Sequence, residues 1–273
     1  MNKLLDQLKC PQFLKSLSID DLKSLTVEVR NRIIDVLSKT GGHLSSNLGI
    51  VELTSALHYV FKSPEDKLIF DVGHQAYVHK LLTGRNKSFP TLRQTRGISG
   101  FLYPPESPHD MFYTGHAGNA LSQALGIAKS RDLSNQDYGV ISIIGDASLT
   151  CGLTFEAFNN IPANLKKFLI VLNDNNMSIS KNVGAIKNIL NGSSTEMPSD
   201  NAKQFFSQFN LDYIGPVDGH NLKELVKQFV NLKTIDKPTL LHVKTVKGYG
   251  LKHAISNPTS FHGAKPFNQL TGQ

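Results

Sequence analysis

The sequence lacks the features that mark membrane proteins and disulfide-stabilised proteins. Its 273 residues include no tryptophan and only two cysteines. No apolar run approaches the ~20 residues that a membrane-spanning helix needs. The N-terminal segment has lysines between its leucines and is a poor signal peptide. Cys10 and Cys151 lie far apart and form no CxxC or metal-ligand pattern, so we expect a cytoplasmic protein.

The chain also lacks a concentrated block of positive charge. The net charge of +7 comes from 29 lysines and arginines that are dispersed, with no run of five or more. No RNA-binding signature is present, so we expect no nucleic-acid partner and, without an apolar span, no membrane partner. A diffuse positive field suits small anions such as phosphates and carboxylates.

Apolar segments of strand length alternate with segments of helical periodicity. Such alternation predicts an α/β fold, a doubly wound parallel sheet with helices on both faces. Ser18, with Asp21 three residues later, predicts the start of the first long helix. We expect helices over 19–38, 51–62, 75–82, 120–131, 155–160 and 222–232, and strands over 68–72, 111–114, 140–144, 168–172 and 239–246.

Two segments interrupt this alternation. Residues 94–110 carry several glycines and prolines, which predicts a loop. Residues 191–201 are polar and rich in turn-forming residues, and we expect a mobile loop near 187–203. The stretch after Gly248 has little periodicity.

Two oxygen-bearing side chains follow neighbouring strands. Gly145 and Asp146 come directly after one apolar run, and Asn175 follows the next, 29 residues beyond Asp146. This spacing accommodates one strand–helix–strand unit, so both side chains are expected at the carboxyl edge of the sheet, where α/β proteins bind ligands. A carboxylate and an amide oxygen suit a Mg²⁺ ion that holds a diphosphate. The alternative is a simple strand end followed by a turn.

Six phrases in the chain are specific enough to indicate a family. They are KTGGHLSSNLGIVELTSALHYVF (39–61), FDVGHQAYVHKLLTGR (70–85), IGDASLTCGLTFEAFN (144–159), NDNNMSISKNVGAI (173–186), YIGPVDGHN (213–221) and HVKTVKGYG (242–250). With them the sequence resembles the 1-deoxy-D-xylulose-5-phosphate synthase family, which is transketolase-like and depends on thiamine diphosphate. The resemblance covers the family's N-terminal, diphosphate-binding domain. It implies a thiamine-diphosphate-binding domain over 1–250 and, over 251–273, the start of a linker to pyrimidine-binding and C-terminal domains.

The resemblance implies a role for particular positions. Asp146, Asn175 and the main-chain carbonyl of Met177 would bind Mg²⁺. His43, His74 and His262 would act at the reacting centre, as groups with pKa values near neutrality that move protons. The remaining cofactor contacts implied by the family motifs, besides His74 and Asn175, are Gly115, His116, Ala117, Ala147 and Ser148.

The other histidines have simpler interpretations. His58 and His79 lie in helical segments and are expected to be packing or surface residues, and His109 and His253 are expected at the surface. The sequence also departs from the family pattern in two places. Ala147 replaces the second glycine of Gly-Asp-Gly, and Leu251 stands where the family has a cofactor-contacting tyrosine.

The implied reaction joins pyruvate and glyceraldehyde 3-phosphate to give 1-deoxyxylulose 5-phosphate and CO₂, for isoprenoid and thiamine precursor synthesis. The implied cofactors are thiamine diphosphate and Mg²⁺. Because the family's second domain supplies further catalytic groups, we expect no turnover from this chain alone, and a homodimer or a partner chain with the missing domains. Two alternatives stay open: the small subunit of a split transketolase-like enzyme, and a non-catalytic homologue that acts as a binding module.

Overall fold

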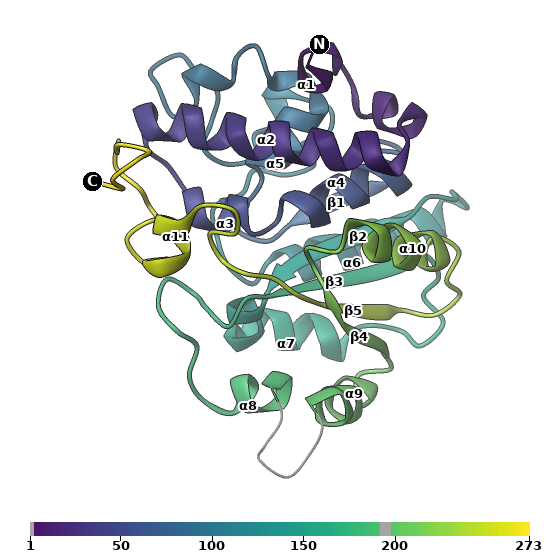
Figure 1. Ribbon diagram of the computed structural model, residues 1–273. Coiled ribbons are helices and arrows are strands. Elements are labelled where there is room, and N and C mark those ends of the chain that lie inside the picture. Colours follow the sequence, from purple (N-terminus) through teal and green to yellow (C-terminus); the bar gives the residue numbers. More distant parts are fainter. Residues whose placement is uncertain (1–2, 192–197) are drawn as a thin grey trace.

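The computed structural model describes residues 3–191 and 198–273, and its centre is a five-stranded parallel sheet (Figure 1). The strand order is β1-β2-β3-β5-β4. All four neighbouring pairs are parallel, as the alternation of elements predicts. The strands are β1 (Lys67–Phe70), β2 (Val140–Gly145), β3 (Phe168–Asp174), β4 (Asp212–Asp218) and β5 (Thr239–Lys244).

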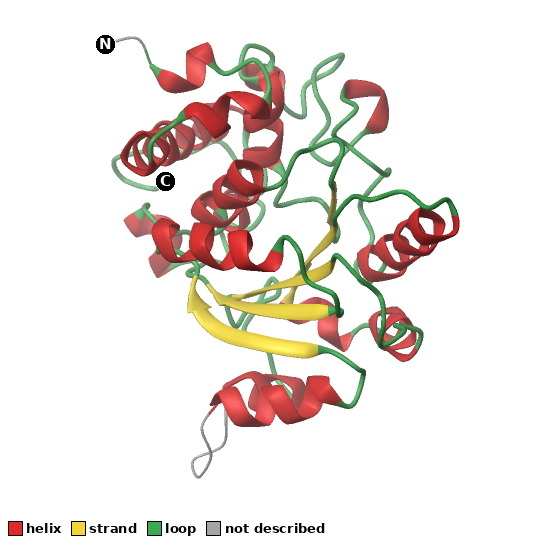
Figure 2. Ribbon diagram, turned by 90° about the vertical axis from the view of Figure 1, so that its right-hand side faces the viewer, coloured by secondary structure: helices red, strands yellow, loops and turns green. Residues whose placement is uncertain are grey.

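Helices cover both faces of this sheet (Figure 2). The predicted cap of the first long helix is present, because the Ser18 hydroxyl accepts the Asp21 N–H at 3.1 Å. The helices are α1 (Leu4–Gln7), α2 (Ile19–Thr40), α3 (Leu44–Leu48), α4 (Val51–Val60), α5 (Tyr77–Lys80), α6 (Ala120–Leu133), α7 (Gly152–Asn159), α8 (Ala185–Asn191), α9 (Pro198–Ser207), α10 (Leu222–Leu232) and α11 (Lys252–Ser256).

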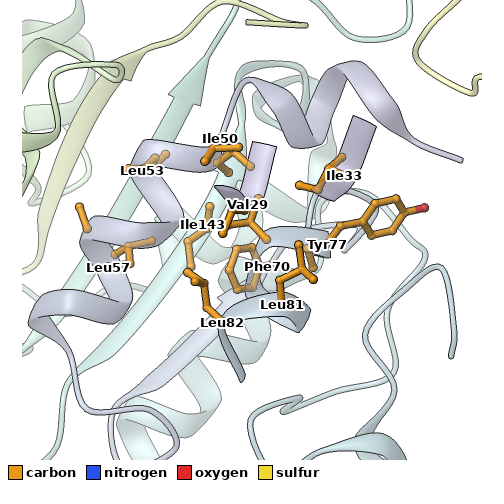
Figure 3. Packing of buried hydrophobic residues seen from close by; sticks show 14 of the residues in the cluster. Val29, Ile33, Ile50, Leu53, Leu57, Phe70, Tyr77, Leu81, Leu82 and Ile143 are labelled. Carbon is orange, nitrogen blue, oxygen red and sulfur yellow. The ribbon is translucent and has the colours of Figure 1, made fainter. Parts of the chain in front are cut away.

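Successive strand residues enter two separate cores, as the two-residue period of a strand requires. Phe70 and Ile143 pack with α2 and α4, where they meet Val29, Ile33 and Leu53 (Figure 3). Ile69 and Ile144 face the other way and pack with α6 and α7. Since each fully buried side chain of this size contributes about 1.5–3 kcal/mol, both cores hold the strand ends in register. The doubly wound α/β fold is therefore confirmed.

The observed strands differ from the predicted ones in two places. Residues 111–114 form no regular strand, so this expectation was wrong; the Thr114 hydroxyl instead accepts the Leu102 N–H, which joins this segment to the 94–110 loop. The edge strand β4 has no counterpart in the sequence prediction, because Gly215-Pro216 reads as a turn. Proline is tolerated there because β4 lies at the edge of the sheet and its pairing shifts between Ile214 and Val217.

The loop and tail predictions have different outcomes. Residues 94–110 form the predicted loop: they contain one short 3-10 helix at Pro104–Glu106 and are otherwise irregular. The expected loop near 187–203 overlaps α8 and α9, and its residues 192–197 lie outside the described residues. The stretch 251–273 packs on the domain: Ala264 and Gly42 form an antiparallel bridge. None of the helices in the described part of the chain is long and apolar enough to cross a membrane.

A polar cluster is buried beside the first core. His58 and His79 are fully buried, as a packing role requires, and their ring nitrogens lie 3.0 Å apart. Asp110 accepts two hydrogen bonds from Arg85, at 2.7 and 2.8 Å, and also contacts His79. His109 is 9% exposed and bonds Ser63 at 2.8 Å, so the expectation of a surface residue was wrong. The reason is this cluster, which satisfies its ring nitrogen inside the fold.

These histidines predict a loss of stability in acid. Burial lowers the pKa of His109 to about 4, and burial together with the neighbouring His79 holds the pKa of His58 well below its usual value. The unfolded chain takes up protons below about pH 6.5, while the folded chain does not. We therefore expect the free energy of unfolding to fall as the pH drops from about 6.5 to 4, by at most about 1.4 kcal/mol per pH unit for each histidine.

Urea unfolding followed by circular dichroism between these pH values measures this effect. His109→Asn should flatten the dependence because one titrating group is removed. His253→Gln, at a half-buried residue of the tail, is the matched control and should leave the slope unchanged. An identical slope in wild type and His109→Asn would contradict the assignment.

Candidate active site

The carboxyl ends of four strands surround one cavity. Its volume is about 570 Å³, and it is lined by residues that follow β1, β2, β3 and β5, together with the expected His43 and His262. The strand register aligns these ends, because Gly145 pairs with Asn173 and Asp174 pairs with Lys244. The two cores on the faces of the sheet thus determine which side chains reach the cavity.

Asp146 and Asn175 converge in this cavity, as their spacing predicts. The N–H of Met177 lies 3.1 Å from an Asp146 carboxylate oxygen and 3.1 Å from the Asn175 side-chain oxygen. Those two oxygens are therefore no more than 6.2 Å apart, the sum of these distances. Asn182 also donates to the same Asp146 oxygen, at 2.9 Å. The Met177 amide lies at this point, while the metal role of its carbonyl stays a prediction.

A second carboxylate lies beside Asp146. Burial raises the pKa of Asp146 well above its ordinary range, and the adjacent charge of Asp174 raises it further. The pKa of Asp174 is low despite its burial, because His242 bonds it at 2.8 Å and Lys244 at 2.5 Å. Lys244 and His242 thus bond Asp174, whereas Asp146 accepts from the neutral Met177 N–H and the Asn182 amide. A divalent cation with oxygen preference fits this donor set.

Within the described residues, no group of three or more histidine, cysteine, aspartate or glutamate side chains is placed to hold a metal ion.

Asp71, at the end of β1, organises the loops around the cavity. Its carboxylate accepts the N–H of Gly118 at 3.0 Å, the N–H of Ala120 at 3.1 Å and the hydroxyl of Ser148 at 2.5 Å. Asp71 is 1% exposed, so these bonds are shielded from water. It thereby joins the segments that carry Ala117 and Ala147. Sequence reasoning missed this residue, although it stands in the family phrase DVGHQ.

The turn after Asp71 has an unusual backbone. Val72 has φ 59° and Gly73 has φ 79°, and a positive φ is rare for a β-branched residue. A Cβ on Gly73 would lie 2.2 Å from the Thr114 hydroxyl, so only glycine fits this approach. Such strain persists where the surrounding structure imposes it, commonly at functional sites. Here it directs His74 into the cavity.

Three histidines from distant segments meet there. The ring centroids of His43 and His74 are 5.3 Å apart, those of His43 and His262 are 5.6 Å apart, and those of His74 and His262 are 5.3 Å apart. Nδ1 of His43 lies 3.3 Å from the Tyr77 hydroxyl, and Nδ1 of His262 lies 3.4 Å from that of Ser46. Nδ1 of His74 is buried without a hydrogen-bond partner among the described residues.

The protonation of this trio differs from the expectation. Burial lowers the pKa of His43 to about 4, that of His74 to about 3 and that of His262 to about 4, and the neighbouring charges add to the effect. The expectation of pKa values near neutrality was therefore wrong for the ligand-free protein. All three rings are neutral at pH 7, so each offers one donor and one acceptor nitrogen.

The expected cofactor contacts are only partly gathered at the cavity. Ala147, Ser148, Asn175 and Ala117 line it. Gly115 and His116 are exposed and are not among its lining residues. Ala147 is absent from the residues with positive φ, so the backbone there does not need the family's glycine.

Lys247 is a lining residue that sequence reasoning missed. It is 5% exposed, and its ammonium group donates to the main-chain oxygen of Ser178. Burial lowers the pKa of Lys247 to about 8, while the nearby Asp146 opposes this change. The signal for it was present, since Lys247 stands in the phrase HVKTVKGYG.

Solved structures of other proteins share this fold. A transketolase from Campylobacter jejuni superposes with a TM-score of 0.74 at 22% identity, covering 89% of this chain and 40% of that one. A transketolase from Leishmania mexicana gives a TM-score of 0.69 at 18% identity, covering 92% and 42%. At such identities the likeness shows the fold alone.

The family follows from sequence comparison. The model of the 1-deoxy-D-xylulose-5-phosphate synthase N-terminal region matches residues 5–204 and 195–245. The synthase of Chlamydia abortus is 49% identical over all of this chain and 48% of its own length, and that of Chlamydia pneumoniae is 50% identical over 96% and 46%. The chain therefore belongs to the 1-deoxy-D-xylulose-5-phosphate synthase family. It spans about half the length of the curated relatives it matches.

The buried carboxyl group of Asp146 is expected to lower the stability of the ligand-free protein at high pH while it favours the binding of a cation. Because its folded pKa is raised, this group stabilises the protein only at low pH, and the contribution is lost as the pH rises through the folded value. Asp146→Asn should therefore increase the free energy of unfolding of the ligand-free protein at pH 8, on the order of 1–3 kcal/mol. Urea unfolding at pH 8 measures it.

The same substitution should make little difference near pH 4, where the wild-type carboxyl is protonated. A variant that is less stable than wild type at pH 8 would show that Asp146 is not an uncompensated charge.

Proposed function

We propose that this domain binds thiamine diphosphate through Mg²⁺ and takes part in forming 1-deoxyxylulose 5-phosphate and CO₂ from pyruvate and glyceraldehyde 3-phosphate. The observation that carries the proposal is the convergence of Asp146 and Asn175 at the strand ends, beside a cavity that holds three histidines. Membership of the synthase family supports the same conclusion. We propose that this product serves as a precursor in isoprenoid and thiamine synthesis, and that the reaction takes place in the cytoplasm.

The ion and the diphosphate have a matching set of groups. Asp146, Asn175 and the Met177 carbonyl would bind Mg²⁺, and the bound ion would stabilise the ionised form of Asp146, which burial otherwise disfavours. The main chain of Ala147 and Ser148, which line the cavity, would approach the diphosphate. The loop of Gly115, His116 and Ala117 would help to hold the cofactor; among these, Ala117 lines the cavity.

The neutral histidines would position the cofactor and exchange protons with the substrates. The unpartnered Nδ1 of His74 is a buried polar atom that needs a hydrogen bond, and a bound cofactor would supply it. His43 and His262 would donate to or accept from substrate carbonyl and hydroxyl oxygens. When bound, thiamine diphosphate supplies the electron sink for the carbon–carbon bond steps.

A second protein surface would cover the cavity. Ile179 and Val183 line it and are 57% and 81% exposed, and Leu153 nearby in α7 is 51% exposed. Exposed apolar side chains around a cofactor cavity favour a partner at this face. We propose a homodimer or a partner chain that carries the remaining domains of the family. The proposal also covers the split-subunit alternative, whereas the conformation of Ala147 removes one argument for a binding-only homologue.

Calorimetry with thiamine diphosphate tests the cofactor proposal. We expect binding that requires Mg²⁺ and is abolished in Asp146→Ala, because the diphosphate loses its bridging ion. Asp137→Ala is the matched control: Asp137 is an exposed carboxylate paired with Lys167, and its loss should leave the affinity unchanged. Wild-type protein that gives no Mg²⁺-dependent heat would contradict the proposal.

Pyruvate decarboxylation tests the reaction. Residues 1–273 should decarboxylate pyruvate when they are mixed with the C-terminal half of a chlamydial relative. His74→Ala in the same mixture should lower the rate at least about a hundredfold, in keeping with the loss of a group that contacts a cofactor at its reacting centre. Activity that is unchanged in His74→Ala would remove this histidine from the mechanism.

A further inference from the structure

Two family phrases, YIGPVDGHN (213–221) and HVKTVKGYG (242–250), lie against each other. The turn after β4, residues 218–221, approaches the residues that follow β5. The Gly219 N–H donates to the Lys244 main-chain oxygen at 2.7 Å, and a Cβ on Gly219 would lie 2.4 Å from Thr245. Only glycine permits this approach. Asn221 then begins α10, because its side chain accepts the Glu224 N–H at 3.1 Å.

This turn places His220 between two partners. The main-chain N–H of Val246 donates to Nε2 of His220 at 2.9 Å. Nε2 is thus an acceptor, so Nδ1 carries the proton and donates to the Glu52 carboxylate, 3.1 Å away. The side chains of His220 and Glu52 are 9% and 8% exposed. One imidazole therefore joins α4 to the start of the segment 246–249, which we call the lysine turn.

The other end of the lysine turn is held by the same network. Arg30 of α2 pairs with Glu52 at 2.5 Å, and its Nε donates to the Tyr249 main-chain oxygen at 3.2 Å. The Tyr249 ring stacks on His220, with centroids 3.6 Å apart and planes inclined by 15°. Arg30 also lies 5.1 Å from the centre of the Tyr249 ring. His220 and Arg30 therefore restrain both ends of the turn.

Lys247 lies between these restraints and points the opposite way, into the cavity. The Gly248 N–H donates to the Ser45 main-chain oxygen at 2.9 Å, so the middle of the turn is also fixed. Lys247 is the residue of the turn that lines the cavity, and its ammonium group reaches Ser178 beyond Met177. A shift of the main chain at Val246 would move this lysine relative to Asp146 and the proposed diphosphate site.

We propose that His220 is a positioning residue for cofactor binding: through the lysine turn it sets where Lys247 meets an anionic cofactor. This inference rests on the proposed cofactor site. Glu52 accepts the proton-bearing Nδ1 of His220 and so keeps Nε2 free to accept the Val246 N–H. Arg30 in turn pairs with Glu52 and neutralises its charge. The motif around His220 thus acts on the cavity from outside it.

Calorimetric titration with thiamine diphosphate and Mg²⁺ tests the proposal on two variants of the same residue. His220→Gln places an oxygen where Nε2 was and keeps an acceptor for Val246, whereas His220→Asn is too short to reach it. We expect His220→Asn to weaken binding about fivefold to tenfold, the effect of one lost hydrogen bond, and His220→Gln to restore most of it. His109→Asn, a buried histidine in the distant polar cluster, should bind as wild type.

A double-mutant cycle separates positioning from a general loss of structure. If His220 acts through Lys247, the effect of His220→Asn should shrink to less than about twofold in a Lys247→Met background. An undiminished effect in that background, or wild-type affinity in His220→Asn, would overturn the proposal. Wild-type protein that binds no thiamine diphosphate would instead refute the proposed function.

A third variant covers the case in which His220→Asn fails to fold. Tyr249→Leu removes the stacked ring and leaves the main-chain bond to Arg30; Tyr249 is 37% exposed, so folding should tolerate the change. We expect binding weakened about threefold, in line with the loss of one aromatic contact. Wild-type affinity in Tyr249→Leu would then count against the network.

Discussion

The candidate site depends on the parallel register of β2, β3 and β5. Because Gly145 pairs with Asn173 and Asp174 with Lys244, the first residues beyond these strands emerge at one edge of the sheet. The packing of the two cores stabilises that register, since a slip of one residue would send every apolar strand side chain to the wrong face. The packing of the core therefore determines the positions of the residues that line the cavity.

Charge is unevenly balanced at this edge. Asp174 accepts hydrogen bonds from His242 and Lys244, whereas Asp146 receives only neutral donors among the described residues. The three cavity histidines are kept neutral by burial and by nearby positive charges such as Lys247. The result is one buried carboxylate that favours a cation, next to neutral donors and acceptors. Burying this carboxylate lowers the stability of the ligand-free domain, and a bound ion would offset that loss. Functional groups often lower the stability of a protein in this way.

Some residues of the family motifs have a physical role that needs no contact with a ligand. Asp71 joins two loops through buried hydrogen bonds, and His220 restrains the turn that carries Lys247. Neither side chain needs to touch a ligand for its replacement to alter binding. A sequence motif can therefore contain both the groups that would contact a ligand and the groups that hold those contacts in place.

Elements with strong periodicity could be predicted from the residues alone: α10 begins and ends where predicted, and the ends of β2 and β3 lie within two residues of the prediction. The sequence also predicted the meeting of Asp146 and Asn175, because strand ends are local features. The tertiary structure alone decided that β4 is an edge strand, that His109 is buried, and that the cavity histidines are neutral. It alone placed Lys247 in the cavity and Gly115 outside its lining. These outcomes arise from burial and from contacts between residues far apart in the chain, which no local pattern records.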